Sequence, residues 1–275
     1  MDLRLMEAFR QYLLSQEKRP ATREKYLRDV RNYVNFLGDQ EVSLSVNLAY
    51  KQYLEEQYAP ASANSMIAAV NAFLSFLGRE DLKLKRLRVQ KKAYCPESAE
   101  LTRGDYEKLV LTARAGGKQR LALVIQTLCV TGIRVSELAY ITREAVERGE
   151  ATVTCKGKTR TILIVSRLRK RLLQYARQRG IQRGPIFTTR TGQPLNRSNI
   201  WKEMKALCAL AGVPAEKVFP HNLRHLFART FYALEKDIAK LADVLGHSNI
   251  NTTRIYIIST GAEHRRKLER MHLLV

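Results

Sequence analysis

Apolar residues recur at the spacing of an α-helix along almost the whole 275-residue chain. Strict alternation replaces that spacing at residues 151–165, where ATVTC and TRTILIV are rich in β-branched side chains. Lys156, Gly157 and Lys158 separate the two runs, which predicts a β-hairpin with a cationic turn. A chain with this pattern is expected to be mainly α, with a small antiparallel β-sheet.

A basic segment, KLKRLRVQKK at residues 83–92, divides the helical pattern into two parts. Before it, amphipathic segments predict helices at residues 3–16, after Pro20 with Thr22 as N-cap, at 44–57 and at 61–77. We therefore expect a helical domain over residues 1–84, a basic linker over 85–98 and a mixed α+β domain over 99–275. The length and the 45% hydrophobic content suffice for a packed core in each of two domains.

The chain is strongly basic, with 48 Lys and Arg against 26 Asp and Glu, a formal net charge of +22 and a pI near 10.1. Such an excess favours a polyanionic partner, usually nucleic acid, with acidic membranes and ribosomes as the alternatives. An isolated basic linker is often merely solvated, but in this chain contact with a phosphate backbone explains it at least as well. The candidate DNA-binding residues are Lys83, Lys85, Arg86, Arg88, Lys91, Lys92 and, in the hairpin, Lys158.

Cysteine usage and hydropathy indicate the compartment. Cys95, Cys129, Cys155 and Cys208 form no CxxC pair, so neither a zinc knuckle nor a disulfide framework is indicated. The N-terminal segment is amphipathic and charged, and no apolar run approaches the ~20 residues of a membrane span. We expect a cytoplasmic protein that is not embedded in a membrane.

The second domain is expected to open with a helix that Thr102 caps and that runs to Ala113. After it, LALVIQTLCVTGIRVSELAYI predicts a long apolar helix, a break at residues 131–132 and a second helix that begins near Arg134. Glu137 follows Arg134 at i+3 and can hold its guanidinium. This pair is either a structural salt bridge or the support of an arginine that binds phosphate at a helix N-terminus.

HNLRH, at residues 221–225, spaces two histidines as a zinc-protease helix does. Asn222 stands where the general-base glutamate would be required, which disfavours metal-dependent hydrolysis. His221 and Arg224 are expected on one helix face, and no acidic residue lies within four positions of the motif. Two such donors without a counter-ion are typical of an anion site.

LGHSNINTTRIY contains His247 and Tyr256. Alone, Tyr256 would more often belong to a core, with Ile255 and Ile257 buried around it, and the segment would also fit a helix-turn-helix. Two arginines, a lysine, two histidines and a tyrosine together fit phosphoryl transfer: cations neutralise a phosphodiester while the tyrosine attacks phosphorus. Neither a metal nor another cofactor is expected.

TGIRVSEL, CKGKTR, HNLRH and LGHSNINTTRIY occur in the order and spacing of the tyrosine recombinase family, the phage-integrase and Xer-type site-specific DNA recombinases, which the chain resembles. The resemblance implies that Arg134 and Arg224 clamp the scissile phosphate, with Glu137 orienting Arg134. It further implies that Tyr256 forms a 3′-phosphotyrosyl bond. The remaining roles that it implies are general acid for Lys156, with Lys158 as the alternative, and proton transfer and transition-state binding for His221 and His247.

The resemblance also implies a SAM-like core-binding domain, a catalytic domain and double-stranded DNA with specific recombination sites as the partner. Four protomers would exchange strands through a Holliday junction, and the protein would be a monomer or a weaker oligomer without DNA. The tail HRRKLERMHLLV would dock on a neighbouring protomer or pack on its own domain. Two alternatives are a DNA-binding transcriptional regulator with a helix-turn-helix and a type IB topoisomerase-like enzyme.

Overall fold

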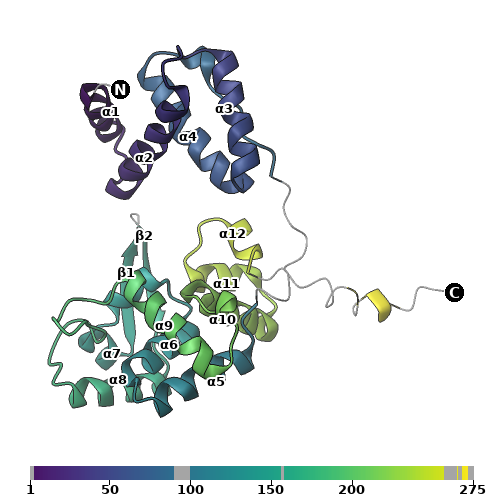
Figure 1. Ribbon diagram of the computed structural model, residues 1–275. Helices are drawn as coiled ribbons and strands as arrows, with labels where there is room; N and C mark the ends of the chain where they lie inside the picture. The colour runs from purple at the N-terminus through teal and green to yellow at the C-terminus, as the bar shows by residue number, and fades with distance from the viewer. Residues whose placement is uncertain (1–2, 90–99, 156–157, 257–264, 266–267, 272–275) are drawn as a thin grey trace. The chain divides into compact units, whose positions relative to one another are not determined.

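The computed structural model describes the chain except residues 1–2, 90–99, 156–157, 257–264, 266–267 and 272–275, and it separates into two compact units (Figure 1). Unit 1 is Met1–Lys91 and unit 2 is Lys92–Val275. Among the described residues, most of the ordered structure is helical and the sheet has two strands, which confirms the predicted fold class. No helix within the described ranges is long and apolar enough to cross a membrane.

Unit 1 is a bundle of α1 (Leu3–Ser15), α2 (Pro20–Leu37), α3 (Leu44–Gln57) and α4 (Pro60–Phe76), followed by the 3₁₀ turn η1 (Glu80–Leu82). The helix predicted at residues 44–57 has the bounds of α3. The prediction of Thr22 as an N-cap was wrong, because α2 already begins at Pro20, with Arg19 at the N-cap and no side-chain cap. Proline suits the first helical position, since its missing N–H would have had no partner there.

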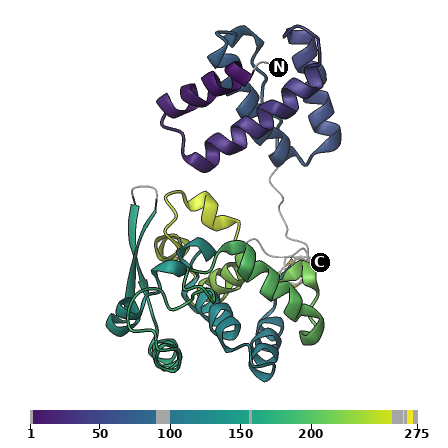
Figure 2. The same cartoon turned by 60° about the vertical axis from the view of Figure 1, so that its left-hand side comes forward.

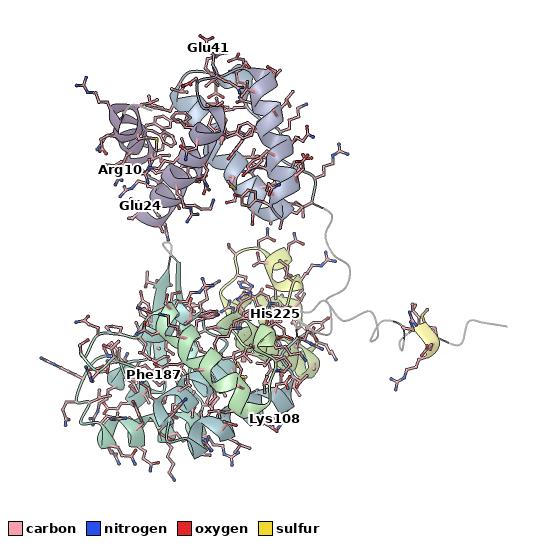
Figure 3. The ribbon with its side chains drawn as sticks, in the orientation of Figure 1. Arg10, Glu24, Glu41, Lys108, Phe187 and His225 are labelled. Atoms are coloured by element: carbon pink, nitrogen blue, oxygen red, sulfur yellow. The ribbon has the colours of Figure 1, made fainter. Side chains whose placement is uncertain are left out.

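Aromatic side chains fill the core of unit 1. The rings of Phe9 and Phe73 meet edge to face at 5.1 Å, and those of Tyr33 and Tyr50 at 5.0 Å. Such pairs add to the burial of apolar area that stabilises the bundle. On the outside, Arg10 of α1 reaches Glu24 of α2 at 3.3 Å (Figure 3).

Two asparagines of α4 form hydrogen bonds with the backbone of the segment that follows η1. Asn71 accepts from the Leu84 N–H at 2.9 Å and donates to the Leu84 carbonyl at 2.8 Å. Asn64 does the same for Leu87, at 2.7 and 3.0 Å. Leu84 is buried in the core of unit 1 and Leu87 packs against it. The first residues of the expected linker therefore run along unit 1 as an extended segment.

Unit 2 begins with α5 (Arg103–Ala115), which Thr102 caps in a reciprocal pair with Asp105, as the sequence predicts. Next come α6 (Gln119–Thr131), the 3₁₀ segment η3 (Val135–Tyr140) and α7 (Arg143–Arg148). The apolar helix α6 is buried along almost its whole length, so the rest of unit 2 packs around it. The elements after the hairpin are α8 (Ser166–Gln178), α9 (Arg197–Ala211), η4 (Ala215–Lys217), α10 (Pro220–Glu235), α11 (Ile238–Leu245) and α12 (Ile250–Arg254).

The predicted hairpin is present as β1 (Glu150–Cys155) and β2 (Lys158–Leu163), which pair antiparallel from Glu150 opposite Leu163 to Cys155 opposite Lys158. Lys158 therefore belongs to β2 and not to the turn. Alternate residues Ala151, Val153 and Ile162 face the core. Figures 1 and 2 both show the hairpin and α12 rising at the same edge of unit 2.

The break after α6 was predicted at residues 131–132, and Gly132 ends the helix there in a left-handed conformation, with φ +62°. A side chain at this position would also lie 2.4 Å from the Phe227 ring, so α10 packs directly on the turn. The segment that follows is a 3₁₀ helix where an α-helix was expected. Glu137 turns back to the Arg134 N–H at 2.7 Å and fixes this tight geometry.

Candidate active site

Arg224, on the buried face of α10, is the centre of the site. It is 1% exposed, and its Nη1 donates to the Gly132 carbonyl at 2.5 Å. Its Nη2 donates to the Leu245 carbonyl and lies 2.8 Å from His247 Nε2. Burial and then the charge of Arg134 lower the pKa of Arg224 to about 10, so the guanidinium is charged at neutral pH. The turn after α6 and the end of α11 thus share one fixed cation.

Arg134 and Glu137 form the ion pair that their spacing predicts. Arg134 Nη1 donates to Glu137 Oε1 at 3.0 Å, and the Glu137 side chain is only 3% exposed whereas that of Arg134 is 40% exposed. Burial alone would raise the pKa of Glu137, but the Arg134 N–H and the Arg160 guanidinium bring it below its ordinary value. The carboxylate is therefore ionised, and one edge of Arg134 remains open to solvent.

Arg160 is a site residue that the sequence reasoning missed. It lies on β2, and its Nη2 donates to Glu137 Oε2 at 2.5 Å. Its Nη1 donates to the Val244 carbonyl at 2.6 Å, at the end of α11. The arginine stands in the quoted motif CKGKTR, but an arginine on a strand carries no local signal of a partner more than twenty residues away.

His247 is oriented from both sides. Nε2 faces Arg224, which can only donate, so Nε2 accepts and the ring proton lies on Nδ1, 2.9 Å from Thr253 Oγ1. Burial, followed by the charges of Arg224, Arg134 and Arg160, lowers the pKa of His247 to about 4. His247 is therefore neutral at pH 7, and it links Arg224 to α12.

Tyr256 is 6% exposed and lies among three histidines. Its ring centroid is 4.4 Å from that of His225 and 5.4 Å from those of His221 and His247. The Arg224 Cζ lies 5.8 Å from the same ring. The Tyr256 ring thus lies buried within unit 2 beside the buried arginine.

The expectation that Ile255 is buried was wrong, because this side chain is 59% exposed. Thr253 and Tyr256 are the buried residues of the segment, and their i, i+3 spacing turns the intervening Ile255 to solvent. Ile257, also expected in the core, lies outside the described residues.

The sequence suggested His225 only as a metal ligand, but His225 of α10, labelled in Figure 3, packs its ring against that of Tyr256. Burial, with smaller contributions from His221 and Arg224, lowers its pKa to about 4. The pKa of His221 is also lowered, by burial and then by Arg224. The i, i+3 and i+4 spacing of HNLRH is the signal that could have placed all three side chains on one face.

The structure brings together six of the predicted site residues, Arg134, Glu137, His221, Arg224, His247 and Tyr256. Lys156 lies outside the described residues, as do Lys91 and Lys92, and Lys158 is described only as part of β2. Lys83 pairs with Glu80 on unit 1, while Lys85, Arg86 and Arg88 are exposed there.

A cavity of about 650 Å³ opens beside Arg134 and His247 in unit 2. Arg134, Arg160 and His247 line it together with Gly246 and Thr252. Glu137 and Asp243 line the same recess, so the partly exposed Arg134 is the side chain there that suits a phosphodiester, whose non-bridging oxygens accept hydrogen bonds.

Comparison with known proteins identifies the family. A family model described as the phage integrase family matches residues 100–263, and one described as the phage integrase N-terminal SAM-like domain matches residues 6–81. The chain belongs to the phage integrase family. Its members are tyrosine recombinases, enzymes that break and rejoin DNA strands, and this chain is one of them.

Sequence relatives agree with this assignment, and a solved structure shares the fold. The chain is 29% identical to the tyrosine recombinase XerA of Thermococcus kodakarensis, over 98% of this chain and 96% of the relative. It is 30% identical to the XerD of Lacticaseibacillus casei, over 86% of each chain. A lambda integrase dimer bound to a COC′ core site matches the fold with a TM-score of 0.74 at 17% identity, covering 92% of this chain and 76% of that one.

Proposed function

We propose that Tyr256 is the nucleophile of this recombinase and that Arg134 and Arg224 hold the scissile phosphate. The observation that carries the proposal is the packing of Tyr256 against Arg224 and three histidines whose pKa values are lowered. A tyrosine that served only the core would not require a buried, hydrogen-bonded arginine such as Arg224 against its ring. Desolvated arginines stabilise the negative charge that develops on a phosphoryl group under attack.

The proposed reaction conserves the phosphodiester bond. The Tyr256 hydroxyl attacks phosphorus, the bond from phosphorus to the 5′-oxygen breaks, and a 3′-phosphotyrosyl bond forms. A neighbouring neutral histidine accepts the phenol proton, and Lys156 supplies a proton to the departing 5′-oxygen. Attack by a 5′-hydroxyl of another strand reverses these steps, so rejoining requires no external energy source.

We infer that the partner is double-stranded DNA with specific recombination sites and that four protomers assemble on two sites. A lambda integrase tetramer bound to a Holliday junction has a similar fold, with a TM-score of 0.71. Integration, excision and dimer resolution all use this chemistry, and we place the protein in the cytoplasm.

An apolar groove on unit 2 supports the assembly. Its cavity is about 350 Å³, and α5, α6 and α10 line it with Tyr106, Val130 and Phe231 among others. The C-terminal tail has exposed apolar side chains to offer, since Leu268 is 64% and Met271 54% exposed. We propose that the tail of one protomer occupies the groove of the next. Truncation after residue 264 is expected to abolish tetramers on DNA while single-site binding persists, and unchanged tetramers would refute this arrangement.

The alternative of a helix-turn-helix regulator is disfavoured by the same geometry. That interpretation would leave the packing of Tyr256 beside the buried Arg224 and three histidines without a purpose. A type IB topoisomerase-like enzyme would share the chemistry but would not assemble two DNA sites.

The test uses DNA with a nick beside the cleavage position, so that the cut fragment diffuses away and the adduct accumulates. Wild type is expected to form a denaturant-resistant protein–DNA adduct, and Tyr256→Phe is expected to form none. Tyr232→Phe is the matched control, since Tyr232 packs against the same apolar cluster. The proposal is wrong if wild type forms no adduct on a site that it binds, or if Tyr256→Phe forms it equally well.

A further inference from the structure

Arg160 contacts three of the four sequence motifs at once. It belongs to the hairpin motif, donates to Glu137 of the first arginine motif and packs against Gly246 of the His247 motif, next to its bond to the Val244 carbonyl. Its side chain is 13% exposed and Glu137 is 3% exposed, so this contact is shielded from water. A shielded, charge-assisted pair holds its geometry more rigidly than a surface ion pair does.

The end of α11 is held by two arginines. Arg160 Nη1 donates to the Val244 carbonyl at 2.6 Å, and Arg224 Nη2 donates to the next carbonyl, that of Leu245, at 2.8 Å. The last carbonyls of a helix have no partner within it, so these arginines satisfy groups that would otherwise be left open. The turn from Leu245 to His247 is therefore fixed between the hairpin and α10.

Gly246, in this turn, packs directly against the aliphatic part of the Arg160 side chain. A Cβ at Gly246 would lie 2.4 Å from Arg160 Cδ and 3.0 Å from its Nε. The glycine also has a φ of +66°, which other residues adopt with strain. Backbone conformation and close approach thus both require glycine before His247.

The hydrogen bonds of Arg160 separate its role from that of Arg134. Both of its Nη groups are used by the protein, and its buried Nε has no partner among the residues that the structure describes. Each Nη of Arg160 already donates to a protein oxygen and its side chain is 13% exposed, whereas the Arg134 side chain is 40% exposed and open to a phosphate. Arg160 acts on Glu137, which in turn holds both the N–H and the guanidinium of Arg134.

We propose that Arg160 is a positioning residue that locks the Glu137–Arg134 pair, the hairpin and the His247 turn into one rigid phosphate-binding unit. The inference rests on the proposed function for its catalytic consequence. Removal of Arg160 leaves Glu137 Oε2 and the Val244 carbonyl without a side-chain donor. Arg134 and His247 then lose their fixed separation, although neither is changed.

The first experiment compares Arg160→Met with wild type by the rate of adduct formation in a single turnover and by the dissociation constant for site DNA. The rate is expected to fall roughly 10- to 100-fold, as for other residues that orient a reacting group, while the dissociation constant changes less than about threefold. A rate within about threefold of wild type would overturn the inference, as would an equal loss of rate and affinity.

Two glycine variants keep Arg160 in place, so they test the contact even where Arg160→Met folds poorly. Gly246→Ala is expected to slow adduct formation, whereas Gly212→Ala, at φ +61° and with nothing within 4 Å, adds similar backbone strain and leaves the rate unchanged. In an Arg160→Ala background the clash is removed, so Gly246→Ala is expected to cost no more than Gly212→Ala. Additive effects of Gly246→Ala and Arg160→Ala would overturn the inference.

The outcome also separates this inference from the proposed function. If wild type forms no adduct, the proposed function fails, and the same double-mutant cycle followed by thermal unfolding still tests the contact between Gly246 and Arg160. If wild type forms the adduct and Arg160→Met forms it at the same rate, the positioning role alone fails.

Discussion

The asparagine pairs on α4 give the most quantitative prediction. Asn71→Ala removes both hydrogen bonds to Leu84, and the remaining bonds at Leu87 belong to Asn64. Each neutral hydrogen bond is worth a net ~0.5–1.5 kcal/mol, so the local opening free energy is expected to fall by about 1–3 kcal/mol. This corresponds to exchange of the Leu84 amide proton that is about 5- to 150-fold faster.

Amide hydrogen exchange, measured on the full chain, gives the loss of protection at each residue. The Leu84 amide is expected to lose protection in Asn71→Ala, and the Leu87 amide in Asn64→Ala. Asn35→Ala is the control, because the side chain of this exposed residue of α2 makes no hydrogen bond with the described part of the chain. Unchanged exchange at Leu84 in Asn71→Ala would refute the account of the fastened segment.

The same variants test whether the segment presents cations to DNA. Lys85, Arg86 and Arg88 are exposed on it, and each phosphate contact contributes about 0.9 to the slope of log affinity against log salt. The double variant Asn64→Ala, Asn71→Ala is expected to lower the slope by about 1 to 3, toward the value for a protein without these cations. An unchanged slope would mean that the cations do not depend on the asparagines.

Two further predictions concern unit 2. The pKa of His225 is lowered to about 4 in the folded state, so the unfolded chain takes up a proton first as the pH falls from about 6.5. Wild type should therefore lose stability between about pH 6.5 and 4, and a plot of Tm against pH should be flatter for His225→Gln; parallel plots would contradict this. Gly132→Ala should destabilise by about 2–4 kcal/mol in urea unfolding, because its Cβ would meet the Phe227 ring at 2.4 Å. Gly149→Ala, at φ +83° in open space, should lose only about 1 kcal/mol, and equal losses would contradict the packing argument.

Local patterns predicted the elements of this fold well. The helix at residues 44–57, the cap at Thr102 and the alternating strands depend on neighbours in the sequence, and all three are present. The failures are positions where distant groups decide. Ile255 faces solvent because Thr253 and Tyr256 are drawn inward, and Arg160 is placed by Glu137 and Val244.

The site shows the same division. The spacing of Arg134 and Glu137 predicted their ion pair, and the spacing of His221 and Arg224 predicted a shared face. The buried position of Tyr256 was not predictable, since it depends on contacts of its ring with His225 of α10 and with His247 in the turn after α11. A periodic pattern predicts which side of a helix is buried, but it does not predict which side chains of other elements pack against that side.

The most direct measurement identifies the residue that becomes linked to DNA. Wild-type protein is incubated with nicked site DNA, the adduct is digested with protease and nuclease, and the modified peptide is sequenced by mass spectrometry. The account predicts a nucleotide attached through phosphate to Tyr256, and Tyr232→Phe should give the same peptide. Attachment at any other residue, or cleavage without a covalent adduct, would contradict the assignment of Tyr256 as the nucleophile.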